Sequence, residues 1–159
     1  MSRYAEGTTV GVEKSRAEIE KTLTRYGATA FAYAWEGSRA VVQFQARERR
    51  IRFDLPLPDP KDPRFREYKR GNNTHARSPE SAREQWEQAC RQAWRALALV
   101  IKAKLEAVEA GITEFENEFL ANIVLPDGKT VAQHVRPEVA IAYQSGKVQA
   151  MLPDYSKGN

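Results

Sequence analysis

The sequence predicts an α+β fold, with a three-stranded antiparallel meander packed on a short N-terminal helix and a long central helix. A C-terminal helix–hairpin–helix segment follows. Two patterns predict this fold: residues 30–57 alternate between apolar and polar with a period of two, whereas residues 79–110 carry apolar side chains at steps of three and four. A length of 159 residues with 42% hydrophobic content fits one domain, residues 1–159, with its own core.

A short amphipathic helix is expected at about residues 16–26. Ser15 and Glu18 have the spacing of a capping box, in which each side chain satisfies a free backbone N–H at the helix start. Apolar residues recur on one helical face from Ile19 onward, and Gly27 provides the expected end.

Three strands are expected to follow. The first alternates three aromatic residues with three alanines over residues 30–35, and the second covers about 40–46. The third, at about 51–57, places its apolar residues on one face, while Arg50 and Arg52 share the other. We therefore expect a meander with one apolar face and one polar, partly cationic face.

Residues from about 56 to 78 are expected to form a long loop. Proline cannot donate to a strand ladder, and this stretch opens with Pro56, Pro58, Pro60 and Pro63. Within it, the basic segment 59–77 is expected to be mobile, because Pro, Asn and charged residues bury little apolar area to offset the entropy of ordering.

The long helix is expected to begin at Ser78-Pro79 and to run to about residue 110, before Gly111. At 1.5 Å per residue, its length would be about 48 Å. Three short strands offer limited area to cover an apolar stripe of that length. We therefore expect a homo-oligomer, with Trp86 nearer the seam than Trp94.

The C-terminal segment shows three further signals. Thr113 and Glu116 have capping-box spacing, which predicts a short helix through about Asn122. The turn sequence Pro126-Asp127-Gly128 predicts a small hairpin, and Arg136-Pro137 predicts the start of a last helix that ends at Gly146.

Several classes of protein are disfavoured by composition. No apolar run approaches the roughly 18 residues needed to span a bilayer, and the N-terminus lacks the apolar core of a secretory signal. Cys90 is the only cysteine, which excludes an internal disulfide framework and fits a reducing compartment. The expected location is therefore cytoplasmic, with no membrane partner.

Positive charge is concentrated in one part of the chain. Residues 39–77 contain eleven Lys or Arg against five Asp or Glu, a net charge of +6, whereas the whole chain carries only +4. A local cationic field of this kind attracts polyanions, nucleic acids among them.

The candidate nucleic-acid site combines cations with aromatic rings. Single-stranded nucleic acid is bound by charge that follows the backbone and by rings on which bases stack. Arginine dominates the segment, which suits phosphate recognition and stacking. The predicted binding residues are Arg47, Arg49, Arg50, Arg52, Arg64, Phe65, Arg66, Tyr68, Lys69, Arg70 and Arg77. The alternative is a solvated, charged loop with no ligand.

No catalytic, metal or cofactor signature is present in the sequence. His75 and His134 have no Cys, His or acidic neighbour at metal-ligand spacing, and the chain lacks the common phosphate, dinucleotide and zinc motifs. Cys90 falls on the apolar stripe of the long helix, which is typical of a buried thiol. We therefore expect a protein that is not an enzyme and needs no cofactor.

Several segments also resemble a known group of sequences: residues 12–28, 50–58, 94–111 and 119–128. They resemble an uncharacterised family of small bacteriophage and prophage proteins, which implies a viral origin but assigns no active site. In addition, the order of helix, meander and long helix is similar to the core of phage single-strand annealing proteins. This second likeness lies in element order alone.

The expected function is that of a non-enzymatic phage protein that binds nucleic acid, with single-stranded DNA favoured, in replication or recombination. The alternative is a viral inhibitor that binds a host defence or polymerase protein through the same cationic surface.

Overall fold

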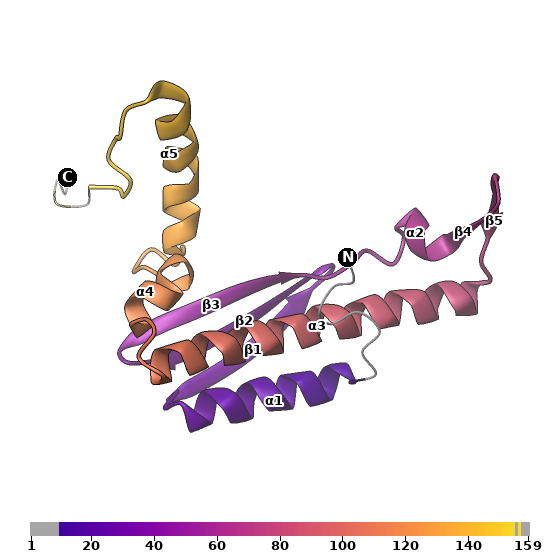
Figure 1. Ribbon diagram of the computed structural model, residues 1–159, viewed down its shortest axis with the longest axis horizontal. Helices are drawn as coiled ribbons and strands as arrows, with labels where there is room; N and C mark the ends of the chain where they lie inside the picture. Colours follow the sequence, from indigo (N-terminus) through magenta and orange to yellow (C-terminus); the bar gives the residue numbers. More distant parts are fainter. Residues whose placement is uncertain (1–9, 155, 157–159) are drawn as a thin grey trace.

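The chain folds as α+β in the computed structural model, which describes residues 10–154 and residue 156 (Figure 1). This confirms the predicted fold class and the central long helix. In chain order the elements are α1 (Val12–Arg25), β1 (Ala30–Glu36), β2 (Arg39–Ala46), β3 (Arg49–Pro56), α2 (Pro63–Arg66), β4 (Glu67–Arg70), β5 (Asn73–Ala76), α3 (Pro79–Glu109), α4 (Phe115–Phe119), a 3-10 turn (Leu120–Asn122) and α5 (Val131–Ser145).

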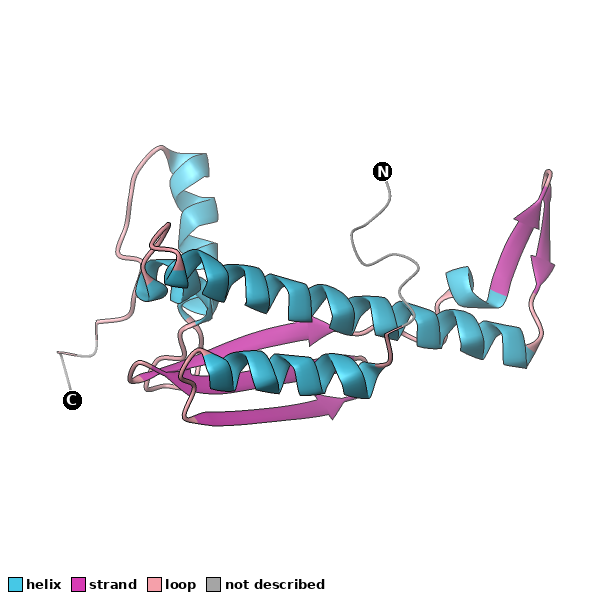
Figure 2. Cartoon of the chain, turned by 60° about the horizontal axis from the view of Figure 1, so that its bottom comes forward, coloured by secondary structure: helices cyan, strands magenta, loops and turns pink. Residues whose placement is uncertain are grey.

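The first three strands form an antiparallel sheet in the order β1-β2-β3. The register places Val42 of β2 opposite Tyr33 on one side and Phe53 on the other, so these three side chains share a face. Helices α1 and α3 both lie on this face (Figure 2). Arg50 and Arg52 lie on the opposite face, which neither α1 nor α3 covers. The alternation of the sequence predicts this arrangement.

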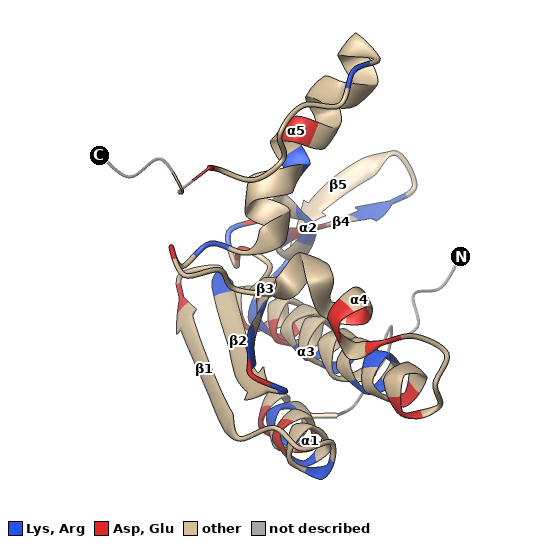
Figure 3. Cartoon of the chain, turned by 90° about the vertical axis from the view of Figure 1, so that its left-hand side faces the viewer, with Lys and Arg blue, Asp and Glu red and all other residues tan. Residues whose placement is uncertain are grey.

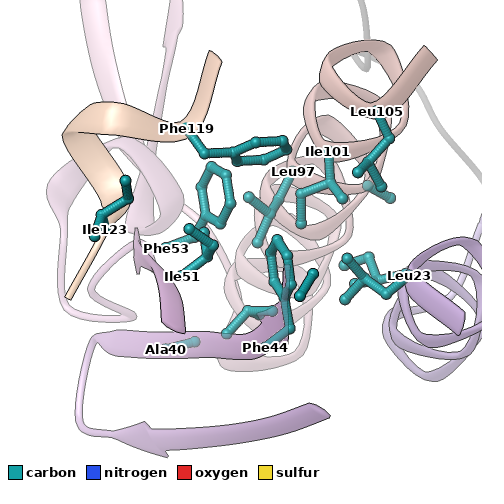
Figure 4. Close-up of a cluster of buried hydrophobic side chains, with 14 of the residues drawn as sticks. Leu23, Ala40, Phe44, Ile51, Phe53, Leu97, Ile101, Leu105, Phe119 and Ile123 are labelled. Atoms are coloured by element: carbon teal, nitrogen blue, oxygen red, sulfur yellow. The ribbon is translucent and has the colours of Figure 1, made fainter. Parts of the chain in front are cut away.

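The core lies between this sheet face and the two helices (Figure 4). Phe119 of α4 packs edge-on against Phe44 and Phe53, with ring centroids 5.8 Å and 6.3 Å away. Leu23 of α1 and Ile101 of α3 complete the layer and are both almost fully buried. The C-terminal elements therefore contribute directly to the same core as the meander.

Helix α1 begins one turn earlier than predicted, and the capping box at Ser15 is wrong. Gly11 occupies the N-cap position, and the backbone N–H of Ser15 donates to the Gly11 carbonyl over 3.0 Å. Ser15 is itself fully buried. Val12, Ser15 and Ile19 recur at steps of three and four, so the extra turn extends the buried face of the helix.

The prediction of an irregular loop at residues 56–78 is also wrong. The stretch contains α2 and a hairpin of β4 and β5. Asp62 caps α2 by accepting a hydrogen bond of 2.9 Å from the backbone N–H of Arg64, and Pro63 occupies the first helical position. Gly71 has a φ of 62° at the first position of the two-residue turn, a conformation that glycine adopts without strain.

Helix α3 confirms the predicted long helix, but it does not leave Trp86 exposed. The Trp86 indole N–H donates to the Pro58 carbonyl over 2.8 Å, and the ring is partly buried. Phe65 of α2, 5% exposed, lies in the same region, where α2 contacts α3. The segment that contains Pro58 and α2 therefore covers part of the apolar face at the N-terminal half of α3. The predicted oligomer seam at Trp86 rested on exposure of this face and loses its physical basis.

The C-terminal segment differs from the prediction at both helix starts. Glu114 is the N-cap residue of α4, and Thr113 makes no capping bond. Helix α5 begins at Val131, not at Arg136, because Thr130 and Gln133 form a capping box and Pro137 is accommodated inside the helix. The predicted hairpin is reduced to one isolated bridge, between Val124 and Thr130.

Helix α5 extends from the body of the molecule (Figure 1), and none of its residues is buried. Among the described residues, no helix is both long enough and apolar enough to cross a membrane.

Candidate nucleic-acid interface

Residues 61–77, named here the basic arm, form the most cationic projection of the chain. The arm comprises α2 and the β4–β5 hairpin, and it lies beside the N-terminal end of α3 (Figure 1). It contains six Lys or Arg against two acids. Every residue of β4 and β5 is exposed, so the hairpin presents both faces to solvent.

The arm is anchored at its base. Phe65 is buried on the side of α3, and the backbone N–H of Arg77 donates to the Arg66 carbonyl over 2.6 Å. The Arg64 guanidinium carbon lies 4.5 Å from the centre of the Phe65 ring, and its Nε lies 3.3 Å from the Asp62 carboxylate. These contacts hold α2 in place, while the hairpin beyond it remains exposed.

Phe65 was predicted to stack on bases, and its burial makes this wrong. A ring that is only 5% exposed cannot offer a face to a ligand. It serves instead as the apolar anchor of the arm, because a buried phenylalanine stabilises the segment that carries it by about 1.5–3 kcal/mol.

The hairpin carries an exposed ring pair, which the predicted irregular loop did not include. Tyr68 and His75 are register partners in β4 and β5, and their rings stack with centroids 5.4 Å apart and an interplanar angle of 26°. The Arg77 guanidinium carbon lies 5.3 Å from the Tyr68 ring centre, and Tyr68 is 41% exposed. The sequence Gly71-Asn72 between two strand-like runs was the signal for this hairpin, since it is a common two-residue turn.

The cations of the arm divide into held and free groups. Arg64 and Arg77 lie over aromatic rings, as described above. The other four side chains are exposed and form no ion pair with any residue that the structure describes: Lys61, Arg66, Lys69 and Arg70. Lys69 and Arg70 lie at the far end of β4, next to the turn (Figure 3).

A cleft of about 420 Å³ lies where the arm meets α3. Its lining includes Lys61, Arg66 and Arg77, with Glu67 as the single acid. Cationic side chains around a cleft near the exposed hairpin provide positions for backbone phosphates.

The other four predicted arginines lie on the β2–β3 turn and the first half of β3, away from the arm. Arg47 belongs to the β2–β3 turn and Arg49 to the start of β3, whereas the arm follows the end of β3 (Figure 1). A strand of eight residues, such as β3, spans about 26 Å. The predicted site is therefore two separate groups of cations and not one continuous surface.

Most of this second group is engaged within the protein. Arg49 Nε lies 3.2 Å from Glu116, and the Arg47 guanidinium carbon lies 5.4 Å from the centre of the Phe115 ring. Arg47 and Glu48 both have positive φ, 48° and 60°, which is uncommon outside glycine. Arg50 alone is exposed without such a contact to a described residue.

The prediction that Arg50 and Arg52 form a free cationic row is wrong. Arg52 donates to the Gly128 carbonyl over 2.9 Å and to the Gln133 side-chain oxygen over 2.8 Å. Its side chain is only 18% exposed. Arg52 therefore joins β3 to the turn at Gly128 and to the first turn of α5. Asp54 lies 3.7 Å from Arg52 Nε and pairs with Arg39 over 2.8 Å.

Three further groups named in the sequence analysis or near them have defined surroundings: His134, Asp127 and Cys90. His134 Nε2 lies 2.6 Å from Asp127, an acidic neighbour that the sequence spacing did not suggest. No group of three or more His, Cys, Asp or Glu among the described residues could hold a metal ion. Cys90 is buried, as predicted, and this burial raises the pKa of its thiol.

Comparison with known proteins gives no relative from which a role could be transferred. No protein-family description matches the chain, and neither the curated proteins nor the solved structures include a significant match. The similarity to phage sequences stays a prediction.

Proposed function

We propose that this chain binds nucleic acid through the basic arm, with single-stranded DNA favoured, as a non-enzymatic protein of replication or recombination. The observation that supports this most is the hairpin itself, which combines an exposed Tyr68–His75 ring pair with the exposed cations Lys69 and Arg70. Cations that follow the phosphate backbone and rings that stack on bases are the two requirements for binding a single strand.

The geometry of the arm favours a single strand over a duplex. Bases of a single strand can rotate onto the exposed Tyr68 ring, whereas bases within a duplex are already stacked on one another. Each stacked base contributes about 1–3 kcal/mol, which corresponds to a factor of about 5–150 in affinity. Arg66 and the cleft at the base of the arm then offer cations for the neighbouring phosphates.

A titration by fluorescence anisotropy tests the proposal. Labelled single- and double-stranded oligonucleotides of equal length are titrated at 50 and 200 mM salt. Tighter binding of the single strand, weakened at high salt, is expected because released counterions drive the association. No binding to either form at 50 mM salt would overturn the proposal and would favour the alternative of a protein partner.

Paired variants assign the binding to the arm. Lys69→Gln with Arg70→Gln should weaken binding and reduce the log–log salt slope by about 1.4, because each phosphate contact on a single strand contributes about 0.7. Lys21→Gln with Lys102→Gln removes the same charge from exposed positions on α1 and α3 and is the matched control. Equal losses in the two pairs would mean that net charge, and not the arm, governs binding.

A further inference from the structure

Strand β1 lies at an edge of the sheet, and no other described strand pairs with its outer side. Its register partner is β2, and its residues take part in no other backbone hydrogen bond within the described part of the chain. Six of its seven residues are exposed. An edge strand of this kind presents a row of unpaired N–H and C=O groups that a further strand can satisfy.

The usual protection of an edge strand is absent from β1. Proteins guard such edges with charged residues, prolines or bulges, or by covering them. Residues 30–35 contain none of these residue types, and Glu36 at the end is the only charge in the strand. The other edge strand, β3, is partly paired. The Val124 N–H donates to the Arg50 carbonyl over 2.8 Å, and Ile123 forms a bridge with Ile51.

The rings of β1 are exposed and yet held in position. Tyr33 is 42% and Trp35 65% exposed, and their rings stack with centroids 6.3 Å apart and an interplanar angle of 15°. The Arg16 guanidinium carbon lies 4.6 Å from the Tyr33 ring centre and 5.6 Å from that of Trp35. A fixed aromatic surface beside a bare backbone edge is suited to a partner strand.

We propose that β1 pairs with β1 of a second copy of this chain, antiparallel and centred on Tyr33, to give a continuous six-stranded sheet. The sequence Ala-Phe-Ala-Tyr-Ala-Trp-Glu is nearly symmetric about Tyr33. Two-fold pairing places Tyr33 opposite its own copy and Phe31 opposite Trp35. On the other face, Ala32 lies opposite Ala34.

This symmetry identifies the occupant as a second copy. In a two-fold interface the same surface must complement itself, so aromatic residues meet aromatic residues and alanines meet alanines across the pair. The inference is independent of the proposed function, because the seam lies on β1 and not on the basic arm, and every test below omits nucleic acid.

Disulfide cross-linking tests the register of the pair. In a Cys90→Ala background, Tyr33→Cys should form a disulfide-linked dimer on oxidation, because paired Cα atoms lie about 4.5–5.5 Å apart. Trp35→Cys is the control: position 35 is more exposed, but its own copy would lie four residues away along the strand, at about 13 Å. Absence of cross-linking at position 33, or equal cross-linking at both positions, would overturn the proposal.

Charge substitution tests the same seam without oxidation. In Ala32→Lys with Ala34→Lys, the lysine at position 32 of one copy lies opposite the lysine at position 34 of the other, and the two repel. Sedimentation velocity at 1–100 μM should then show a shift from dimer to monomer. Ala32→Glu with Ala34→Lys faces opposite charges and should keep the dimer. Gln43→Lys with Gln45→Lys places equal charge on the same face of β2 and should also keep it. A monomeric wild type, or a doubly lysine-substituted β1 that remains dimeric, would contradict the seam.

Discussion

Replacing Arg52 should destabilise the fold far more than replacing Arg50, although the two arginines are two residues apart on one strand. Arg52 makes two charge-assisted hydrogen bonds, at 2.9 Å to Gly128 and 2.8 Å to Gln133. In Arg52→Met the aliphatic stem remains, but both donors are lost. Arg50→Met is the matched control, because its side chain is exposed and makes no such bond to a described residue.

The magnitude follows from the two bonds and their partial exposure. A hydrogen bond to a charged group contributes about 1.5–3 kcal/mol when well shielded. The Arg52 side chain retains 18% exposure. The Gln133 oxygen still accepts from the Thr130 N–H, and Gly128 is exposed to water, so neither acceptor is left without a possible partner. We therefore expect a loss of about 2 kcal/mol for the pair of bonds, which is below the roughly 3–6 kcal/mol that two well-shielded bonds would contribute.

Urea denaturation followed by circular dichroism measures this difference. With a slope of about 2 kcal/mol per molar urea, Arg52→Met should lower the midpoint by about 1 M. Arg50→Met should stay within about 0.5 kcal/mol of the wild type, as surface substitutions do. Equal midpoints for the two variants would refute the assignment of Arg52 to the joint between β3 and the α5 segment.

Three further outcomes follow from the arm and from α3. Gly71→Ala should destabilise the hairpin by about 1–2 kcal/mol, because the φ of 62° is unfavourable with a β-carbon, and hydrogen exchange of β4 and β5 should accelerate while α3 is unaffected. Trypsin should cut the free protein first at Lys69 or Arg70, since the hairpin exposes every residue; first cleavage within α3 would contradict a weakly held arm. Cys90 should not react with an aromatic disulfide reagent at pH 8 in the native state, because burial raises the pKa of its thiol and leaves little thiolate; stoichiometric reaction without unfolding would contradict its place in the core.

The parts of the fold that sequence patterns predict are those governed by local periodicity. The meander and α3 follow directly from alternation with period two and from apolar steps of three and four. Signals that depend on one residue, such as helix caps, predict less well. Ser15 has the spacing of an N-cap, but α1 begins at Val12, and Ser15 is buried on the helical face that packs against the core. Proline favours the first turn of a helix, so Pro137 predicts a start at Arg136. The helix begins at Val131 instead, because Thr130 provides the capping box.

The candidate site was predicted in composition but not in arrangement. Which arginines are free depends on contacts between residues 67 to 81 positions apart, such as Arg49 with Glu116 and Arg52 with Gln133. No local pattern encodes such pairs. The burial of Phe65 likewise depends on the long-range contact between α2 and α3. The four prolines before residue 64 favoured the prediction of a loop over that of a hairpin with its turn at Gly71.

The central claim is that the exposed ring pair of the hairpin contacts a bound single strand, and photochemical cross-linking tests it most directly. A single-stranded oligonucleotide carrying 5-bromouracil is bound to the full chain and irradiated, and the chain is then cleaved after glutamate. Cleavage after Glu67 and Glu80 releases residues 68–80, which contain both Tyr68 and His75. We expect this peptide to carry the main adduct and Tyr68→Ala to remove most of it. Adducts confined to peptides outside residues 61–80 would contradict contact between the ring pair and the strand.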